Sequence, residues 1–134
     1  MAYYANEILN IIDPGNELIC YRLFNEHCYR TASGHFIKDL RIIKNRDMAN
    51  MVIVDNAAYS YAMQTNNGVP IIPFFNDKSD SELTDLVVYL TELSKSKDVR
   101  DEISQFFYSK LFWDHCQDPA VLKEKLVQAR SALR

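Results

Sequence analysis

The feature that most constrains the fold is the apolar run Met51-Val-Ile-Val, which ends abruptly at Asp55 and Asn56. The run is rich in β-branched residues and does not alternate with polar ones, which is typical of a strand buried on both faces of a parallel sheet. In open α/β sheets, ligands bind just outside the carboxyl ends of the strands. Asp55 and Asn56 therefore stand where a site could lie, although both residue types also serve as ordinary turn residues.

Helical and strand-like patterns alternate around this run. Asp13-Pro14 ends the first helical pattern, because the residue before proline disfavours the α region. Ser79-x-x-Glu82 has the form of a capping box, and Asp118-Pro119 that of a helix start. The predicted elements are a helix over 2–12, a strand over 18–24, a hairpin over 28–37, strands over 52–55 and 69–75, and helices from 79, 98 and 119. Strands separated by helices or crossovers predict an α/β fold with a parallel sheet.

Composition narrows the class of protein. With 134 residues, 48% hydrophobic and 25% charged, the chain fits one soluble globular domain with a real core. A net charge of -3 and the absence of a basic run argue against nucleic-acid binding. Three cysteines without a C-x-x-C pair favour a reduced, intracellular compartment. No leader peptide is expected, and no apolar run approaches the ~20 residues of a transmembrane segment.

Lys38, Asp55 and Asn56 form the one convergent set of chemical groups. A carboxylate and an amide oxygen at a strand end suit Mg²⁺, and a nearby ammonium would neutralise a phosphoryl group. This set contains no nucleophile with an evident activator. Lys38 also fits an ordinary solvated lysine. The pairs His27-Cys28 and His115-Cys116 are a weak zinc signal without ligands at zinc spacing, and the aromatic stripe over 106–113 fits a packing surface.

Taken in order, these residues resemble the C-terminal part of the phosphatase domain of the small CTD phosphatases, the NLI-interacting-factor-like branch of the haloacid-dehalogenase superfamily. The resemblance covers residues 3–100 and leaves 104–134 outside it, so we predict a partial phosphatase-like domain over 1–100 and a helical extension over 101–134. Its motifs are Tyr4-Ala5, Ile8-Leu9-x-x-Ile12-Asp13, Tyr21-Arg22-Leu23-Phe24, Glu26-x-Cys28, Phe36-Ile37-Lys38-Asp39-Leu40, Val52-Ile53-Val54-Asp55-Asn56, Ser60-Tyr61, Asn67-x-Val69-Pro70, Phe75 and Ser79-Asp80-x-Glu82-Leu83-x-Asp85-Leu86.

The resemblance implies a Mg²⁺-dependent phosphatase that acts on phosphoserine or phosphothreonine through an aspartyl-phosphate. Lys38 falls on the family's phosphate-neutralising lysine. Asp55 and Asn56 fall on its metal-site motif, with Asn56 as the direct ligand, and Arg22 matches an arginine near the substrate phosphate. The chain departs from the family at Ala57-Ala58, and at Asn25 and His27, which puts substrate contacts in doubt more than the metal site.

The larger departure concerns the family's nucleophile motif, Asp-x-Asp-x-Thr, which occurs nowhere in these residues. By analogy with the family, two central strands would lie between the strands over 18–24 and 52–55. Without these central strands, the edges of both flanking strands that face the gap would have backbone N–H and C=O groups without partners. Each such group costs roughly 1–3 kcal/mol of stability when it is buried, and the free energy of unfolding of a domain is only about 5–15 kcal/mol. A partner chain could supply these strands, the flanking strands could close up into a sheet of about three strands, or the sequence could be incomplete.

Two functions follow from this departure. We expect a non-catalytic or incomplete phosphatase-like subunit that acts as a structural component of a protein assembly. The alternative is the metal-and-lysine half of a split phosphatase whose aspartate nucleophile lies on another chain, with Mg²⁺ bound only when the site is completed. The family favours a cytoplasmic or nuclear setting and leaves a mitochondrial one open.

Overall fold

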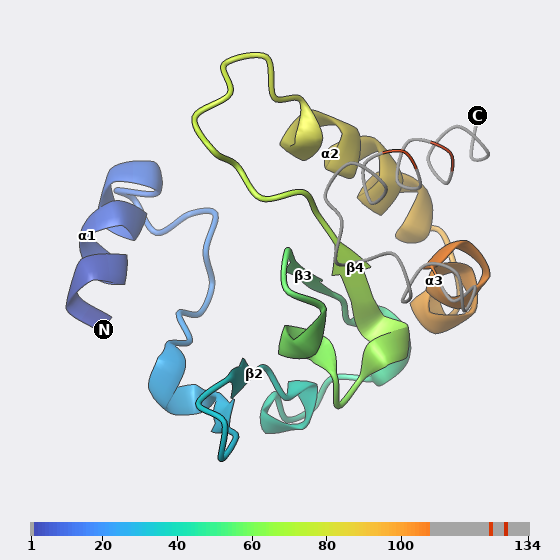
Figure 1. Cartoon of the computed structure of the whole chain (residues 1–134), viewed down its shortest axis with the longest axis horizontal. Helices are drawn as coiled ribbons and strands as arrows, with labels where there is room; N and C mark the ends of the chain where they lie inside the picture. The colour runs from blue at the N-terminus through green and yellow to red at the C-terminus, as the bar shows by residue number, and fades with distance from the viewer. Residues whose placement is uncertain (1, 108–123, 125–127, 129–134) are drawn as a thin grey trace.

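The computed structural model describes residues 2–107, 124 and 128, and Figure 1 shows their arrangement. Among these residues, one α-helix precedes the short strands and two follow them, and two of the strands pair in parallel, so the α/β class is confirmed. Of the helix predicted from 119, only residues 124 and 128 are described, and the end of the helix predicted from 98 lies outside the described residues. The helices are α1 (Ala2–Ile12), α2 (Glu82–Leu93) and α3 (Val99–Phe107), and the strands are β1 (Tyr29–Arg30), β2 (Phe36–Ile37), β3 (Ile53–Asp55) and β4 (Gly68–Pro70).

The centre of the fold is the parallel pair β3–β4, in register from Ile53↔Gly68 to Asp55↔Pro70. Residues 56–67 connect the two strands through two 3-10 turns, η4 (Ala58–Tyr61) and η5 (Thr65–Asn67). The turn η5 is tied down by Asn67, a buried residue whose Nδ2 donates to the carbonyl oxygens of Met48 and Met51 at 2.7 Å each. A small parallel sheet is therefore present, as the partial haloacid-dehalogenase-like fold predicts.

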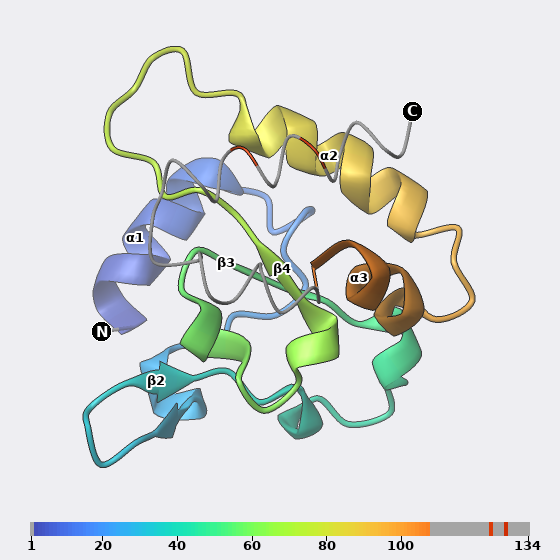
Figure 2. The ribbon, with the colours of Figure 1, turned by 45° about the vertical axis from the view of Figure 1, so that its right-hand side comes forward.

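Both faces of β3 are covered, as its unbroken apolar sequence predicts. Val52 and Val54 pack against one cluster and Ile53 belongs to the other, because successive side chains of a strand point to opposite faces. Helices α2 and α3 cover the first face, and 3-10 turns cover the second (Figure 2). The first cluster consists of Val69, Leu86, Tyr89, Leu93, Val99, Ile103 and Phe107, and the second of Leu40, Met51, Ile53 and Tyr61.

The predicted hairpin is confirmed, with β1 and β2 antiparallel and Tyr29 opposite Ile37. The turn closes through Gly34, whose N–H donates to the Thr31 carbonyl at 2.9 Å and whose φ of 88° lies in the region that glycine adopts without a steric cost. This hairpin is a sheet of its own, separate from β3–β4.

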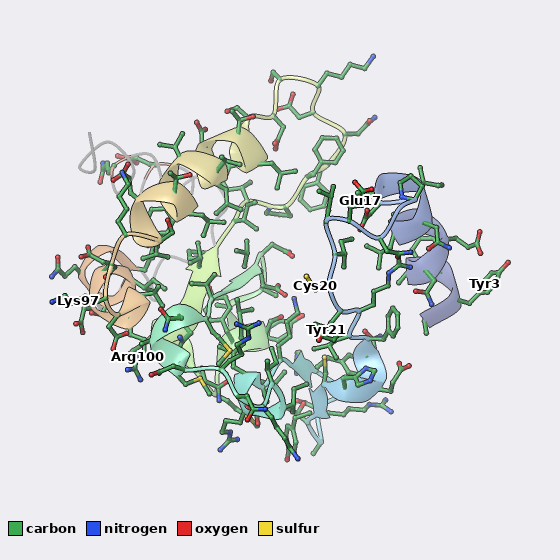
Figure 3. All side chains as sticks on the ribbon, turned by 180° about the vertical axis from the view of Figure 1, so that it is seen from behind. Tyr3, Glu17, Cys20, Tyr21, Lys97 and Arg100 are labelled. Atoms are coloured by element: carbon green, nitrogen blue, oxygen red, sulfur yellow. The ribbon has the colours of Figure 1, made fainter. Side chains whose placement is uncertain are left out.

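The predicted strand over 18–24 is wrong, and with it the direct pairing of that segment with residues 52–55. Among the described residues, strands form only the pairs β1–β2 and β3–β4, so the segment over 18–24 belongs to neither sheet. Its apolar side chains at Leu18, Tyr21 and Leu23 are exposed. Figure 3 shows Cys20 and Tyr21 on this segment between α1 and the β3–β4 pair, with the Cys20 side chain pointing toward the pair.

The segment is fastened to α1 instead. The buried Asp13 carboxylate accepts N–H bonds from Glu17, Leu18 and Ile19 at 2.8–3.1 Å. Burial works to raise the pKa of Asp13, but the three N–H bonds and the charge of Arg22 lower it below the usual value. The helix α1 matches its prediction over 2–12, yet none of its own residues is buried. Asp13 and its neighbours, rather than a core, therefore hold α1 in place.

Two further element boundaries differ from the predictions. Strand β4 ends at Pro70 rather than at residue 75, and Phe74 and Phe75 are exposed beyond it. Helix α2 begins at Glu82, so Ser79 is not its cap: the Ser79 hydroxyl donates to Asp77 at 2.7 Å, and Asp80 accepts the N–H of Glu82 at 3.0 Å. The described helices all fall short of the length and apolarity needed to cross a bilayer.

Candidate functional site

The structure brings Lys38 and Asp55 into contact at the carboxyl end of β3. The Lys38 Nζ lies 2.6 Å from Asp55 Oδ2. Lys38 directly follows β2, and its backbone N–H donates to the Ser60 carbonyl in η4 at 2.7 Å. The hairpin and the β3–β4 connection therefore fix the lysine backbone while β3 fixes the carboxylate, so two segments far apart in sequence build the pair.

The two members of this pair differ in their exposure to solvent. The Asp55 side chain is 12% exposed and the Lys38 side chain 49% exposed. The second carboxylate oxygen, Asp55 Oδ1, accepts the N–H of Ala57 at 2.8 Å and so also closes the turn after the strand. The half-exposed ammonium can still reach an incoming anion, whereas both Asp55 oxygens already have hydrogen-bonding partners.

Asp39 holds the turn that follows Lys38. Its carboxylate accepts the backbone N–H of Arg41 at 3.0 Å and three hydrogen bonds from the Arg41 guanidinium at 2.7–3.1 Å. It also accepts the Gln64 side-chain amide at 3.0 Å. The hydrogen bonds from Arg41 lower the pKa of Asp39 to about 2 against the effect of burial, with smaller contributions from the Arg41 charge and Gln64. Gln64 also accepts the N–H of Leu40 at 3.1 Å, so it links this turn to the β3–β4 connection.

Asn56 and Arg22 occupy different surroundings from the Lys38–Asp55 pair. Asn56 follows β3 directly and is exposed, next to Asp55 in the chain. The Arg22 guanidinium donates to the side-chain oxygens of Asn10, Asn16 and Asn6 at 2.7, 2.9 and 3.1 Å. The structure therefore places Arg22 against α1, and its predicted contact with a substrate phosphate stays a prediction.

The donor set fits Mg²⁺ only in part. Phosphatases of the haloacid-dehalogenase type generally use this ion, which takes six oxygens in octahedral geometry. Asn56 presents one open amide oxygen, whereas Asp55 is engaged by an ammonium that would repel a second cation. Among residues 2–107, no group of three His, Cys, Asp or Glu side chains is placed to hold a metal.

A cavity of about 350 Å³ lies beside the pair. Lys38 and Asp39 stand on its lining, together with Phe24 and the β3 residues Ile53 and Val54. Most of the other lining residues are aliphatic: Leu23, Leu40, Ile42, Ile43 and Val52. The half-exposed cation of the site thus faces an apolar hollow along one edge of β3.

Other residues that the sequence singled out have structural roles, and some important ones gave no signal. The His27 ring accepts the backbone N–H of Phe24 at 2.9 Å within the turn η1 (Asn25–His27). His115 and Cys116 lie outside the described residues. Gln64 belongs to none of the motifs quoted above, and Ser60-Tyr61 is quoted without a role, so only the contacts in the folded chain show that Gln64 and the Ser60 carbonyl position the segment around Lys38.

Comparisons with known proteins show which family the sequence is similar to. The sequence profile described as NLI interacting factor-like phosphatase matches residues 1–100. CTD small phosphatase-like protein 2 of Dictyostelium discoideum is 42% identical over 104 residues, which cover 78% of this chain and 18% of that protein. CTD small phosphatase-like protein 3 of Caenorhabditis elegans is 41% identical over 99 residues, which cover 73% of this chain and 34% of that protein.

A third relative is more distant but aligns over more of the chain. CTD nuclear envelope phosphatase 1B of Danio rerio is 30% identical over 113 residues, which cover 84% of this chain. The chain spans only 18–45% of the length of these three relatives. The similarity therefore concerns one part of each relative.

Proposed function

Because the chain belongs to the NLI interacting factor-like phosphatase family, we propose that these residues act as an incomplete phosphatase-like component of a larger protein assembly. In this role they contribute structure and binding surface, and they do not hydrolyse phosphate esters alone. The compartment is intracellular and reducing, where the free thiols of the exposed Cys20 and the half-buried Cys28 persist.

The observation that carries this proposal is the combination of a formed Lys38–Asp55 pair with a sequence that contains no Asp-x-Asp-x-Thr motif. Covalent phosphoryl transfer needs a nucleophile that an adjacent group activates. Asp55 does not supply one, since its carboxylate is neutralised by Lys38 and hydrogen-bonded by the Ala57 N–H. What remains is a surface that can position a phosphoryl group without attacking it.

The test is hydrolysis of p-nitrophenyl phosphate by the purified 134-residue chain at neutral pH with Mg²⁺. We expect no release of phosphate above buffer, and the same result for the variant Lys38→Ala. Hydrolysis by the chain that disappears in Lys38→Ala would show that these residues are catalytic by themselves, and the proposal would be wrong.

A second function is favoured by the close contact itself. A lysine 2.6 Å from the acid at a strand end is the half of a phosphatase site that binds and neutralises the phosphoryl group. Under this alternative, another chain carries the aspartate nucleophile, Mg²⁺ binds only between the two chains, and the substrate is a phosphoserine or phosphothreonine protein.

Two experiments distinguish these functions: adding a nucleophile-bearing polypeptide to the chain, and purifying the native protein. If the chain is half of a split phosphatase, adding a polypeptide with the Asp-x-Asp-x-Thr segment produces activity that Lys38→Ala and Asn56→Ala abolish. If it is a structural component, native purification from its own cells yields a stable complex. Both variants then leave that complex intact, and no added segment produces activity.

A further inference from the structure

The hydroxyl of Ser33 lies at the tip of the β1–β2 hairpin, apart from the Lys38–Asp55 pair. Ser33 is exposed, and a Cβ atom added at the next residue, Gly34, would meet nothing within 4 Å. The hairpin lies at the edge of the molecule, on the far side of the β3–β4 pair from α2 (Figure 2). An enzyme can therefore approach the Ser33 hydroxyl from solvent.

The Ser33 hydroxyl is held between two other side chains of the turn. Its Oγ lies 2.9 Å from His35 Nδ1 and 2.9 Å from Thr31 Oγ1. Thr31 Oγ1 also accepts the backbone N–H of His35 at 3.0 Å. The His35 ring lies against the ring of Tyr59 in η4, with the two centroids 4.7 Å apart. The hydroxyl is therefore next to a histidine ring that connects the hairpin to η4.

The charges of the hairpin favour an anion at this hydroxyl. Residues 27–38 contain one arginine, one lysine and two histidines, and no Asp or Glu. Arg30 is exposed, with its guanidinium carbon 5.8 Å from the centre of the Phe36 ring. In the part of the chain that the structure describes, no carboxylate forms an ion pair with Arg30. Its charge is therefore available to a partner that approaches the hairpin tip.

Arg30 precedes Ser33 by three residues, and no other Ser or Thr of the 134 residues has an arginine at that spacing. Protein kinases select their substrates by the pattern of charges around the target hydroxyl. We propose that Ser33 is a phosphorylation site for a serine/threonine kinase that recognises Arg30. This inference goes beyond the proposed function and does not depend on it.

The reaction is an ordinary phosphoryl transfer from ATP. Ser33 Oγ attacks the γ-phosphorus, the bond from that phosphorus to the β–γ bridging oxygen breaks, and ADP leaves. The hydroxyl proton passes to the catalytic aspartate of the kinase. Strands β1 and β2 pair over only two residues each, and so short a hairpin opens at a low free-energy cost. The tip can therefore enter the active site of the kinase.

Phosphorylation changes the contact between the hairpin and η4. A phosphoserine carries about -1.5 to -2 charges at neutral pH and three acceptor oxygens. At Ser33 these oxygens accept a charge-assisted hydrogen bond from the adjacent His35 ring. His35 already contacts Tyr59, and the Lys38 N–H donates to the carbonyl of the neighbouring Ser60. The phosphoryl group therefore strengthens the attachment of the hairpin to η4, which positions the backbone of Lys38.

The test is incubation of the full 134-residue chain with Mg-ATP and a kinase that selects arginine three residues before serine. We expect mass spectrometry of the peptides to find one phosphoryl group, on Ser33. Ser81 is an internal control, because it is also exposed and follows Lys78 by three residues but lies between Asp80 and Glu82. It should stay unmodified. Ser33→Ala should abolish incorporation, and Thr31→Val should keep it within a few-fold.

The role of Arg30 is measured by the kcat/KM of the kinase. Arg30→Ala should lower this value about tenfold or more, since one charge-assisted hydrogen bond is worth that factor. The matched control is Arg46→Ala, an exposed arginine outside the hairpin, which should leave it unchanged. Absence of incorporation, a phosphoryl group on another residue, or equal values for Arg30→Ala and the original chain would overturn the proposed site.

Amide exchange tests the consequence for η4. Phosphorylation should slow exchange of the Lys38 N–H about tenfold or more, again the effect of one charge-assisted hydrogen bond. This slowing should disappear in His35→Gln, whose amide cannot carry the charge. Unchanged Lys38 exchange in the phosphorylated chain would overturn the connection to η4. Hydrolysis of p-nitrophenyl phosphate by the chain would instead contradict the proposed function, so the two failures are distinct.

Discussion

At the scale of single residues, Asp39 shows how one carboxylate can position a neighbouring functional group. It caps the turn η2 (Leu40–Ile42) immediately after Lys38, and hydrogen bonds from Arg41 lower its pKa to about 2. The ordinary value near 3.9 applies in the unfolded chain, so the unfolded chain takes up the proton first as the pH falls. Asp39 therefore stabilises the fold fully above about pH 4 and progressively less toward pH 2.

This difference in protonation can be measured by urea unfolding of the original chain and the variant Asp39→Asn. The original chain should be the more stable one at pH 6, because the amide cannot form the charged pair with Arg41. The gap in unfolding free energy should narrow as the pH falls from 4 to 2. A gap that stays constant over this range would mean that Asp39 is not ionised through its contacts with Arg41.

At the scale of elements, the β3–β4 pair depends on a close approach between Gly68 and the Tyr61 ring. A Cβ atom at position 68 would lie 2.1 Å from Tyr61 Cδ2, and Tyr61 is almost fully buried. Neither β4 nor the ring can move freely, because Gly68 is in register with Ile53. The sequence shows only a glycine after Asn67, and the contact becomes apparent only in the fold.

Gly68→Ala should therefore lower the free energy of unfolding by about 1–3 kcal/mol, the usual cost of overpacking a core. The matched control is Gly15→Ala, where the new Cβ would meet only the flexible Glu17 side chain at 3.3 Å. That substitution should change stability by no more than about 0.5 kcal/mol. Equal effects of the two variants in urea unfolding would show that the Tyr61 contact is relaxed in solution.

Element by element, the sequence predicted what local patterns determine. The helix over 2–12, the hairpin around Gly34 and the β-branched run at Ile53 follow from spacing and turn chemistry, and the structure has all three. The segment over 18–24 has an equally strong strand pattern, but a strand also needs a neighbour, which a local pattern cannot provide. Helix α2 begins late because Ser79 bonds to Asp77, a local competitor for the expected cap.

The candidate site likewise has a part that the sequence predicted and a part that it did not. The approach of Lys38 to Asp55 was predictable from the end of an apolar strand and from the family resemblance. The placement of Arg22 against three asparagines was not, because those partners lie up to 16 positions away in sequence. The metal-ligand and substrate roles of Asn56 and Arg22 stay predictions, as does the division of the chain at residue 100.

At the scale of the whole molecule, stability is concentrated where α2 and α3 meet β4. Ile103 is fully buried in the cluster with Val69 and Phe107. The rings of Tyr89 and Phe107 pack edge to face, with their centroids 5.6 Å apart. Burial accordingly raises the pKa of Tyr89. Helix α3 crosses residue 100, where the family match ends, and its buried residues belong to the same cluster as Val69 of β4.

Ile103→Ala should cost about 2–5 kcal/mol, because the cavity it leaves is enclosed by buried side chains. Val87→Ala on α2 is the matched control, since Val87 is 63% exposed and its truncation should cost no more than about 0.5 kcal/mol. The measurement is thermal or urea unfolding of the full chain. Similar losses for both variants would show that α3 does not pack against β4 in solution.

Helix α1 should behave differently from α2 and α3. It contributes no buried residue, and Tyr3, Tyr4 and Ile11 are all more than 60% exposed. Regions with few buried contacts open at a low free-energy cost. Amide exchange measured on the native chain should therefore be faster in α1 than in α3. Equal protection of the two helices would mean that another surface covers α1, for example in a self-associated state.

The short connection between β3 and β4 also bears on the rate and order of folding. Parallel strands usually require a crossover through an α-helix, but residues 56–67 join these two through 3-10 turns alone. A loop of about this length closes in roughly 10–100 ns. A ribosome adds only about 5–20 residues per second. The parallel pair can therefore begin to form during translation, before α2 and α3 have left the ribosome.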